Sequence, residues 1–232
     1  MNEENIYQSG QIILIDKPLE WTSFQVVNKM RHHIRKKYGL KKIKVGHAGT
    51  LDPLATGLLV ICTGKATKRI EELQAGEKEY EVTMQLGVAS PSFDLETKPE
   101  PSGEYIHITE EQIKQVLSSF LGETSQLPPM FSAVKVDGKR LYDLARKGES
   151  LELQPRTIHI SKIEITYFEA PVVRFTVRCS KGTYIRSLVS DIGKLLGCGA
   201  VMTALRRTAS GEHHLDDAYS LEDWLDRLNN EE

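Results

Sequence analysis

Apolar residues recur along the chain with two different periods, and these periods predict its secondary structure. Positions 78–86 alternate between polar and apolar side chains, which is typical of a half-buried strand. The unbroken apolar run at 58–62 indicates a buried strand. We expect further strands at residues 12–16, 131–136, 158–167, 172–179 and 201–206.

A spacing of three to four residues predicts the helices. Apolar residues follow this spacing after Ser23, which we expect to cap a helix. Thr109 and Gln112 have the spacing of a capping box, so a second helix begins there, and Gly122 ends it. Shorter or later helices are expected at 141–146, at 184–196 and after Ser220. Strands and helices do not alternate regularly, which predicts an α+β protein around a mixed or largely antiparallel sheet.

Composition excludes several classes of protein. The chain has 232 residues, of which 40% are hydrophobic and 27% charged, as in ordinary globular proteins. No apolar run approaches the ~20 residues that span a bilayer, and the first residues do not resemble a secretory signal. The three cysteines are few and far apart, which favours a reduced, cytoplasmic protein.

Charge is nearly balanced overall but segregated along the chain. The formal net charge is -2, yet residues 21–51 contain eight Lys and Arg residues and no acid. Residues 172–207 hold seven Lys and Arg residues against one acid, Asp191. A surface of one sign can bind phosphates even on a nearly neutral protein. A solvated helix face is the alternative, and the sequence leaves both interpretations open.

The densest motif is GHAGTLDPLATG at residues 46–57. It carries a single carboxylate, Asp52, which we interpret as a candidate catalytic group held on a rigid loop. The alternative is structural, because Asp followed by Pro is a common turn or helix start.

A second motif, CSKGTYIR at residues 179–186, joins a predicted strand to a predicted helix. Gly182 allows the turn and Thr183 can cap the helix. Arg186 offers a planar donor fork to a carboxylate or a phosphate. The alternative is a capped helix with a surface arginine.

Other common sites do not fit the sequence. Gly64-Lys65 lacks the remaining residues of a phosphate-binding loop, since Leu59 and Ala66 occupy the required positions. The histidines do not have metal-ligand spacing. We therefore expect neither a nucleotide cofactor nor a metal.

Several motifs together resemble one family. They are GHAGTLDPLATGLL, KEYEV at 78–82, SKGTYIRSL at 180–188, Asp16-Lys17-Pro18, the stretch 126–148 and Leu205-Arg206-Arg207. In this order they closely resemble the TruB family of tRNA pseudouridine-55 synthases, over residues 12–208. The resemblance implies a pseudouridine synthase fold and isomerisation of a uridine in the T arm of tRNA, without metal or cofactor.

The resemblance also implies roles for individual residues. Asp52 matches the catalytic aspartate, which could attack carbon 6 of the base or carbon 1 of ribose, or assist a glycal intermediate. Tyr80 matches the catalytic tyrosine that stacks on the target base and is proposed to help remove the proton at carbon 5. Arg186 matches the arginine that pairs with the aspartate. The residues that match substrate-binding or supporting positions are His47, Lys17, Asp94, Tyr184 and Leu205.

The chain departs from the family pattern in two places. The loop at residues 88–94 reads VASPSFD, where many relatives carry a Thr-Asp-Thr-rich version, so the match of Asp94 rests on altered neighbours. The resemblance assigns residues 1–211 to a catalytic domain and leaves 212–232 as an acidic extension, too short for the PUA-type RNA-binding domain of many relatives.

The expected partner is therefore the T arm of tRNA, bound by a monomer that contacts no membrane. Two other hypotheses remain at this stage. One is a relative that needs guide RNA and partner proteins. The other is a non-catalytic module that binds or folds tRNA, for which the basic stretches would suffice.

Overall fold

A computed structural model describes residues 5–131, 135–136, 139–140 and 153–230. They form two compact units: the first comprises the chain up to Tyr80 together with the chain from Leu205 onward, and the second comprises Glu81–Ala204. The chain passes between the units twice, both times within a strand. These strands are β4 (Lys78–Leu86) and β12 (Ala200–Ser210).

The first unit holds a mixed sheet with the strand order β14-β1-β3-β12. Strand β1 is antiparallel to β3, while β12 runs parallel to β3 and β14 parallel to β1. Short strands β2 and β13 pair with β3 and β12. The elements are α1 (Ile6–Ser9), β1 (Ile12–Lys17), α2 (Ser23–Lys37), β2 (Val45–His47), β3 (Ala55–Thr63), η1 (Gly64–Arg69), α3 (Ile70–Ala75), β13 (His213–His214), η2 (Leu215–Asp217), β14 (Tyr219–Ser220) and α7 (Leu221–Asn230).

Strand β3 is apolar without interruption because both of its faces are covered. Leu59 and Ile61 belong to the apolar cluster under α2 and α7. Leu58 and Val60 belong to a second cluster on the other side, with Ala48. A strand that is buried on both faces loses the usual alternation of polar and apolar residues. The prediction of a buried strand at 58–62 is confirmed within a longer element.

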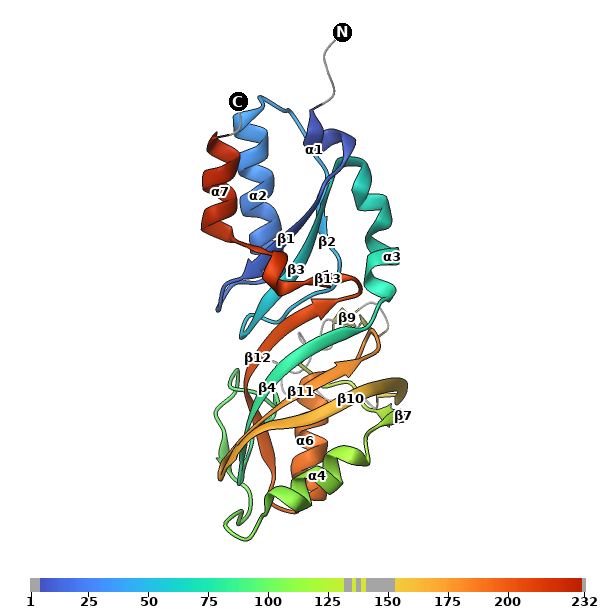
Figure 1. The fold of residues 1–232 in the computed structure, drawn as a ribbon, viewed down its shortest axis with the longest axis vertical. Helices are drawn as coiled ribbons and strands as arrows, with labels where there is room; N and C mark the ends of the chain where they lie inside the picture. Colours follow the sequence, from blue (N-terminus) through green and yellow to red (C-terminus); the bar gives the residue numbers. More distant parts are fainter. Residues whose placement is uncertain (1–4, 132–134, 137–138, 141–152, 231–232) are drawn as a thin grey trace. The chain divides into compact units, whose positions relative to one another are not determined.

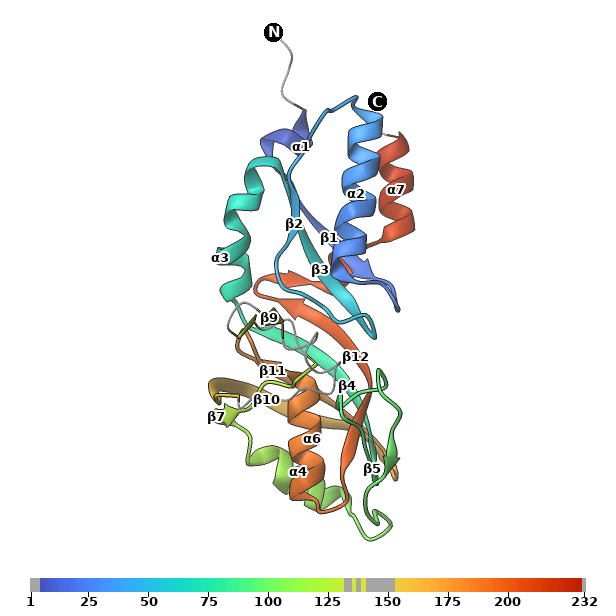
Figure 2. The same ribbon diagram turned by 180° about the vertical axis from the view of Figure 1, so that it is seen from behind.

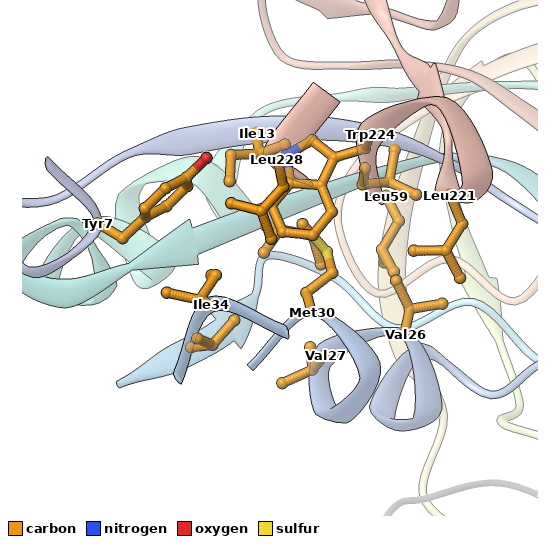
Figure 3. Packing of buried hydrophobic residues seen from close by; sticks show 13 residues of the cluster. Tyr7, Ile13, Val26, Val27, Met30, Ile34, Leu59, Leu221, Trp224 and Leu228 are labelled. Atoms are coloured by element: carbon orange, nitrogen blue, oxygen red, sulfur yellow. The ribbon is translucent and has the colours of Figure 1, made fainter. Parts of the chain in front are cut away.

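Helices α2 and α7 lie side by side in the first unit (Figures 1 and 2). Figure 3 shows how their side chains meet over the sheet. Trp224 of α7 is buried in this cluster, as are Leu221 and Leu228. Burial of each such side chain stabilises the fold by roughly 1.5–3 kcal/mol. Part of the predicted acidic extension thus contributes to the core, whereas the division of domains at residue 211 stays a prediction.

The second unit holds a sheet in which β10 is antiparallel to both β11 and β7. Its strand order is β12-β4-β11-β10-β7, and helices α4 and α6 lie on one face of it (Figures 1 and 2). Two-stranded pairs β5–β6 and β8–β9 stand apart from this sheet. The further elements are β5 (Val88–Ala89), β6 (Glu100–Pro101), α4 (Glu110–Ser118), β7 (Gly122–Gln126), β8 (Lys135–Val136), β9 (Lys139–Arg140), β10 (Arg156–Glu169), β11 (Val172–Cys179) and α6 (Ile185–Leu195).

The predicted α+β fold with a mixed sheet is confirmed, and so are most of its elements. The predicted cap of α2 and the predicted end of α4 are wrong. Thr22, not Ser23, caps α2, because its side chain accepts from the Gln25 backbone in a capping box. Gly122 does not end a helix: α4 already stops at Ser118, and Gly122 begins β7 with a φ of +86°. The predicted helix at 141–146 and part of the strand at 131–136 lie outside the described residues.

Candidate active site

Asp52 lies in the turn that joins β2 to β3. Its side chain is half-buried, and its carbonyl accepts from the Ala55 backbone over 3.1 Å. The turn continues through Pro53, whose carbonyl accepts from the Glu20 backbone. The predicted Asp-Pro turn is therefore present. It also places the carboxylate on a loop whose backbone is tied at several points.

The buried hydroxyl of Ser23 fixes the residue that precedes the carboxylate. Its Oγ donates to the Leu51 carbonyl over 3.0 Å and accepts from the Leu51 N–H over 2.9 Å. One hydroxyl thus satisfies both backbone groups of a buried loop residue, which would otherwise cost free energy. Because Ser23 is the first residue of α2, the beginning of that helix is coupled directly to the Asp52 loop.

Lys17 supports the loop from β1. Its side chain is 0% exposed, and its Nζ donates to the carbonyls of Pro18, Trp21 and Pro53 at 2.8, 2.5 and 3.4 Å. Burial lowers the pKa of Lys17 to about 8, while the nearby Asp52 opposes this shift. The predicted supporting role fits this geometry. The ammonium group is enclosed by backbone carbonyls in this structure. A direct contact between Lys17 and the substrate stays a prediction.

Arg207 holds both ends of the same loop. Its Nη2 donates to the Gly49 carbonyl over 3.1 Å, and its Nε donates to the Leu58 carbonyl over 2.7 Å. The residue is 1% exposed. A buried guanidinium is retained only where its donors are satisfied. The two hydrogen bonds join the segment before Asp52 to the strand after it.

The sheet register brings the two buried cations beside each other. Gly57 of β3 pairs with Lys17 on one side and with Arg207 on the other. A Cβ at Gly57 would collide with the backbone of Arg207, and the φ of Gly57 is +98°. This position therefore requires glycine. The Asp52 carboxylate interacts with the Lys17 charge, since it opposes the lowering of the Lys17 pKa.

His47 lies on β2, just before the loop. Burial lowers the pKa of its imidazole and the charge of Arg207 lowers it further, while a hydrogen bond with the Gly49 backbone opposes the shift. Its Nδ1 is buried and makes no hydrogen bond with the residues that the structure describes. A contact of this nitrogen with a substrate would require it to become accessible. The RNA contact of His47 stays a prediction.

Tyr80 and Leu205 complete the candidate residues of the first unit. Tyr80 is a buried residue of β4, on the alternating apolar face that the sequence indicates. Leu205 is a buried residue of β12 and pairs with Ala55, three residues after Asp52. The structure thus brings Leu205 next to the strand that leaves the loop. Contacts of either side chain with a flipped base stay predictions.

In the second unit, Arg186 is buried at the beginning of α6. Both Arg186 and Asp94 have side chains that are 4% exposed, and the distance from Arg186 Nε to Asp94 Oδ2 is 3.6 Å. The guanidinium also donates to the carbonyls of Phe131 (2.9 Å) and Ser92 (3.3 Å). The alternative of a surface arginine is therefore wrong. Asp52 belongs to the other unit, so its pairing with Arg186 stays a prediction.

The loop around Asp94 is closely hydrogen bonded. Ser90 Oγ donates to the Asp94 carbonyl over 2.7 Å, and Asp94 Oδ1 accepts from the Glu96 backbone over 2.9 Å. Ser92 and Thr97 share hydrogen bonds, and Phe93 has a φ of +64°. The serines that depart from the family pattern thus build the loop internally. A contact of Asp94 with RNA would require its buried carboxylate to become accessible, and it stays a prediction.

Tyr184 occupies the N-cap position of α6. The Gln126 amide bridges its backbone, accepting from the Tyr184 N–H over 2.8 Å and donating to the Tyr184 carbonyl over 3.0 Å. The Arg156 guanidinium lies 5.0 Å from the centre of the Tyr184 ring. The predicted Thr183 cap is wrong, because the Thr183 hydroxyl donates instead to the Ser180 carbonyl. Support of the substrate pocket by Tyr184 stays a prediction.

Two residues that hold the Asp52 loop, Ser23 and Arg207, are not predicted from the sequence to do so. Nothing in the spacing of Ser23 or Arg207 indicates that each would bond to the Asp52 loop, since these partners are far away in the chain. In the described residues, no helix is both long and apolar enough to cross a membrane. No cluster of three His, Cys, Asp or Glu side chains with metal-binding geometry occurs in the same ranges.

Two domain models of one protein family together match residues 35–232 of this chain. The model of the TruB family pseudouridylate synthase N-terminal domain matches residues 35–185, and the tRNA pseudouridylate synthase B C-terminal domain matches residues 186–232. The tRNA pseudouridine synthase B of Phocaeicola vulgatus is 55% identical over 229 residues, covering 97% of each chain. That of Parabacteroides distasonis is 53% identical over 220 residues, covering 95% of this chain and 94% of the relative.

Solved structures show the same fold. A chain in the crystal structure of a Cbf5-Nop10-Gar1 complex has a TM-score of 0.71 and 36% identity, over 95% of this chain. A chain in the structure of an H/ACA RNP bound to a substrate RNA containing 2'-deoxyuridine has a TM-score of 0.68 and 32% identity, again over 95% of this chain. This chain spans about half the length of those two, 54% and 53%. Together with the domain matches and the curated relatives, these similarities show that the chain belongs to the TruB family of pseudouridylate synthases.

Proposed function

We propose that this protein isomerises the uridine at position 55, in the T arm of tRNA, to pseudouridine. The observation that carries the proposal is the Asp52 loop: a single carboxylate in a turn that Ser23, Lys17 and Arg207 tie to the surrounding sheet and helix. Membership of the TruB family, and relatives named tRNA pseudouridine synthase B, support the reaction and the substrate.

The chemistry suits a fixed carboxylate. The base must leave ribose through nitrogen, turn, and rejoin ribose through carbon 5, so product and substrate have the same atoms and no cofactor is consumed. Covalent attack by Asp52 on the base or on ribose divides this rearrangement into easier steps. A loop tied at both ends keeps the carboxylate oriented, which lowers the entropic part of the barrier.

The target base must first leave its stack. Extrusion of a nucleotide costs a few kcal/mol, which the pocket repays by stacking and by hydrogen bonds to the base. In our proposal Tyr80 stacks on the flipped base and helps to remove the proton at carbon 5, while nitrogen 1 gains a proton, and Leu205 supplies apolar contact to the base. His47 contacts the displaced RNA. Arg186 pairs with Asp52 when the substrate is bound.

The remaining assignments follow from the same proposal. The protein acts as a monomer in the cytoplasm, and its macromolecular partner is tRNA, recognised mainly through the shape and phosphates of its folded arm.

The test is to incubate purified protein with an unmodified tRNA transcript, without guide RNA, ATP or added metal, and to map pseudouridine by chemical labelling. We expect a single new pseudouridine at position 55. Product that forms only after guide RNA and partner proteins are added would favour the guide-dependent hypothesis. Tight binding of tRNA with no product under either condition would favour the non-catalytic module.

A further inference from the structure

One surface of the first unit carries exposed positive charge that the site described above does not use. It consists of five exposed lysines on α2 and on the loop that follows it, which we call the α2 basic face: Lys29, Lys36, Lys41, Lys42 and Lys44. Within the described ranges, none of the five forms an ion pair. No acidic residue occurs between positions 21 and 51, so this stretch contains no neutralising charge of its own.

The charges on this face act on their neighbours. The pKa of His33 is lowered first by burial, and then by the positive charges of Lys29, His32 and Lys36. His32 and His33 pack edge to face, with ring centres 5.4 Å apart. The opposite side of the helix is apolar and belongs to the core shown in Figure 3. Packing therefore explains the inner side of α2 but not the positive charge of Lys29 and Lys36 on its outer side.

The position of this face relative to Asp52 follows from hydrogen bonds within the unit. The first residue of α2, Ser23, bonds to Leu51, next to Asp52. From there the helix extends over 15 residues, or about 22 Å. The basic loop then leads back into β2, where the Gly64 backbone donates to the Lys44 carbonyl over 2.8 Å. The first lysine of the face, Lys29, is six residues beyond Ser23, or about 9 Å along the helix.

We propose that the α2 basic face binds the phosphate backbone of the tRNA at positions remote from the target uridine. This inference rests on the proposed function and adds a second contact surface to it. Lysine ammonium groups on flexible stems suit phosphates, which position a nucleic acid without reading its sequence. Polyanionic RNA fits this surface, because Lys29 and Lys36 lie seven residues apart on one side of α2, about 10 Å along the helix, and three more exposed lysines follow in the next loop.

The test compares two triple variants with equal loss of charge. One replaces lysines of the face: Lys29→Gln, Lys36→Gln and Lys42→Gln. The matched control replaces exposed lysines of the second unit: Lys98→Gln, Lys114→Gln and Lys162→Gln. The control lysines at 114 and 162 form exposed ion pairs, which contribute little to stability. Binding of full-length tRNA and of a T-arm hairpin is measured between 50 and 300 mM salt.

Each lost phosphate contact removes roughly 0.7–0.9 from the slope of log K against log salt. We expect the face variant to lose about 2 in slope and about tenfold or more in affinity for full-length tRNA, with a much smaller loss for the hairpin. Its KM should rise while kcat at saturating tRNA stays near the wild-type value. The control variant should match the wild type in slope.

Equal slopes for both variants would overturn the proposal, and so would equal losses for tRNA and hairpin. Unchanged tRNA binding by the face variant would overturn the proposal and favour an acidic protein as the partner of these lysines. Because the assay measures binding, it is independent of the reaction. A wild-type protein that makes no pseudouridine would contradict the proposed function, while a slope change specific to the face variant would still support this surface.

Discussion

Replacing Arg207 with methionine tests whether the Asp52 loop must be held at both ends. Methionine keeps an unbranched apolar stem but removes the charge and both donors, so the Gly49 and Leu58 carbonyls lose their partner. A hydrogen bond from a charged donor contributes about 1.5–3 kcal/mol, and two such bonds give roughly 3–6 kcal/mol. Relief from burying a guanidinium offsets several kcal/mol of this loss.

We therefore expect a net loss of about 1–3 kcal/mol in unfolding free energy, measured by urea denaturation. The loss of activity should be larger in proportion, because a displacement of about 1 Å in a catalytic group can cost 10²-fold in rate. Single-turnover formation of pseudouridine should slow by about that factor, while tRNA binding changes little. Arg207→Lys should recover stability better than rate, since one ammonium group cannot reproduce a fork to two carbonyls.

A matched control is Arg174→Met, which removes an exposed guanidinium that lies 5.1 Å from the centre of the Tyr167 ring in the second unit. Its stability and rate should stay close to those of the wild type. The reasoning about Arg207 would be refuted if Arg207→Met folded with near wild-type stability and turned over at the wild-type rate. It would also fail if Arg174→Met lost as much stability and as much rate as Arg207→Met.

Three further predictions follow from the same contacts. The pKa of Lys17 is about 8, below the usual 10.5, so kcat/KM should fall as the pH rises through 8 and Lys17 loses its proton. The stability contribution of Lys17 should rise between pH 8 and 10.5, because the unfolded chain binds more protons there. Lys17→Arg should abolish the alkaline decline in kcat/KM, and an unchanged pH profile in this variant would contradict the assignment. Ser23→Ala leaves the N–H and carbonyl of Leu51 without their partner, so it should cost about 1–3 kcal/mol of unfolding free energy and slow the single-turnover rate. Ser23→Thr keeps a hydroxyl and should restore part of the stability and part of the rate. Asp94→Asn leaves the Arg186 guanidinium buried with less compensation and should lower stability by about 3 kcal/mol, and a variant with wild-type stability would show that the 3.6 Å pair contributes nothing.

Much of the fold can be predicted from the sequence because its periods are clear. The alternation at 78–86 gives β4 with its observed bounds, and the run at 58–62 gives the buried part of β3. The prediction fails where local signals compete. Thr22 and Ser23 are adjacent and both suit an N-cap, but the Ser23 hydroxyl is hydrogen bonded to the Leu51 backbone, so Thr22 caps the helix. Gly122 lies where a helix could end, yet its positive φ starts a strand instead.

The site could be predicted only in part, for a different reason. Asp52 can be found from the sequence because it lies in a dense local motif, and because the family resemblance of the chain covers most of its length. Arg207 acts through carbonyls of Gly49 and Leu58, about 150 positions away in the chain, and backbone acceptors carry no signal in a sequence. The buried pair of Asp94 and Arg186 likewise depends on tertiary structure, because the loop of Asp94 and the helix of Arg186 are distant in the chain.

We propose that the carboxylate of Asp52 is required to isomerise the tRNA uridine. The most direct measurement compares the wild type with Asp52→Asn, using one purified tRNA transcript at saturating enzyme. Tritium release from carbon 5 of uridine and chemical mapping of pseudouridine follow the reaction, while a filter assay follows binding. We predict that Asp52→Asn folds and binds tRNA with near wild-type affinity, yet makes no pseudouridine. Turnover by Asp52→Asn near the wild-type rate would contradict the account.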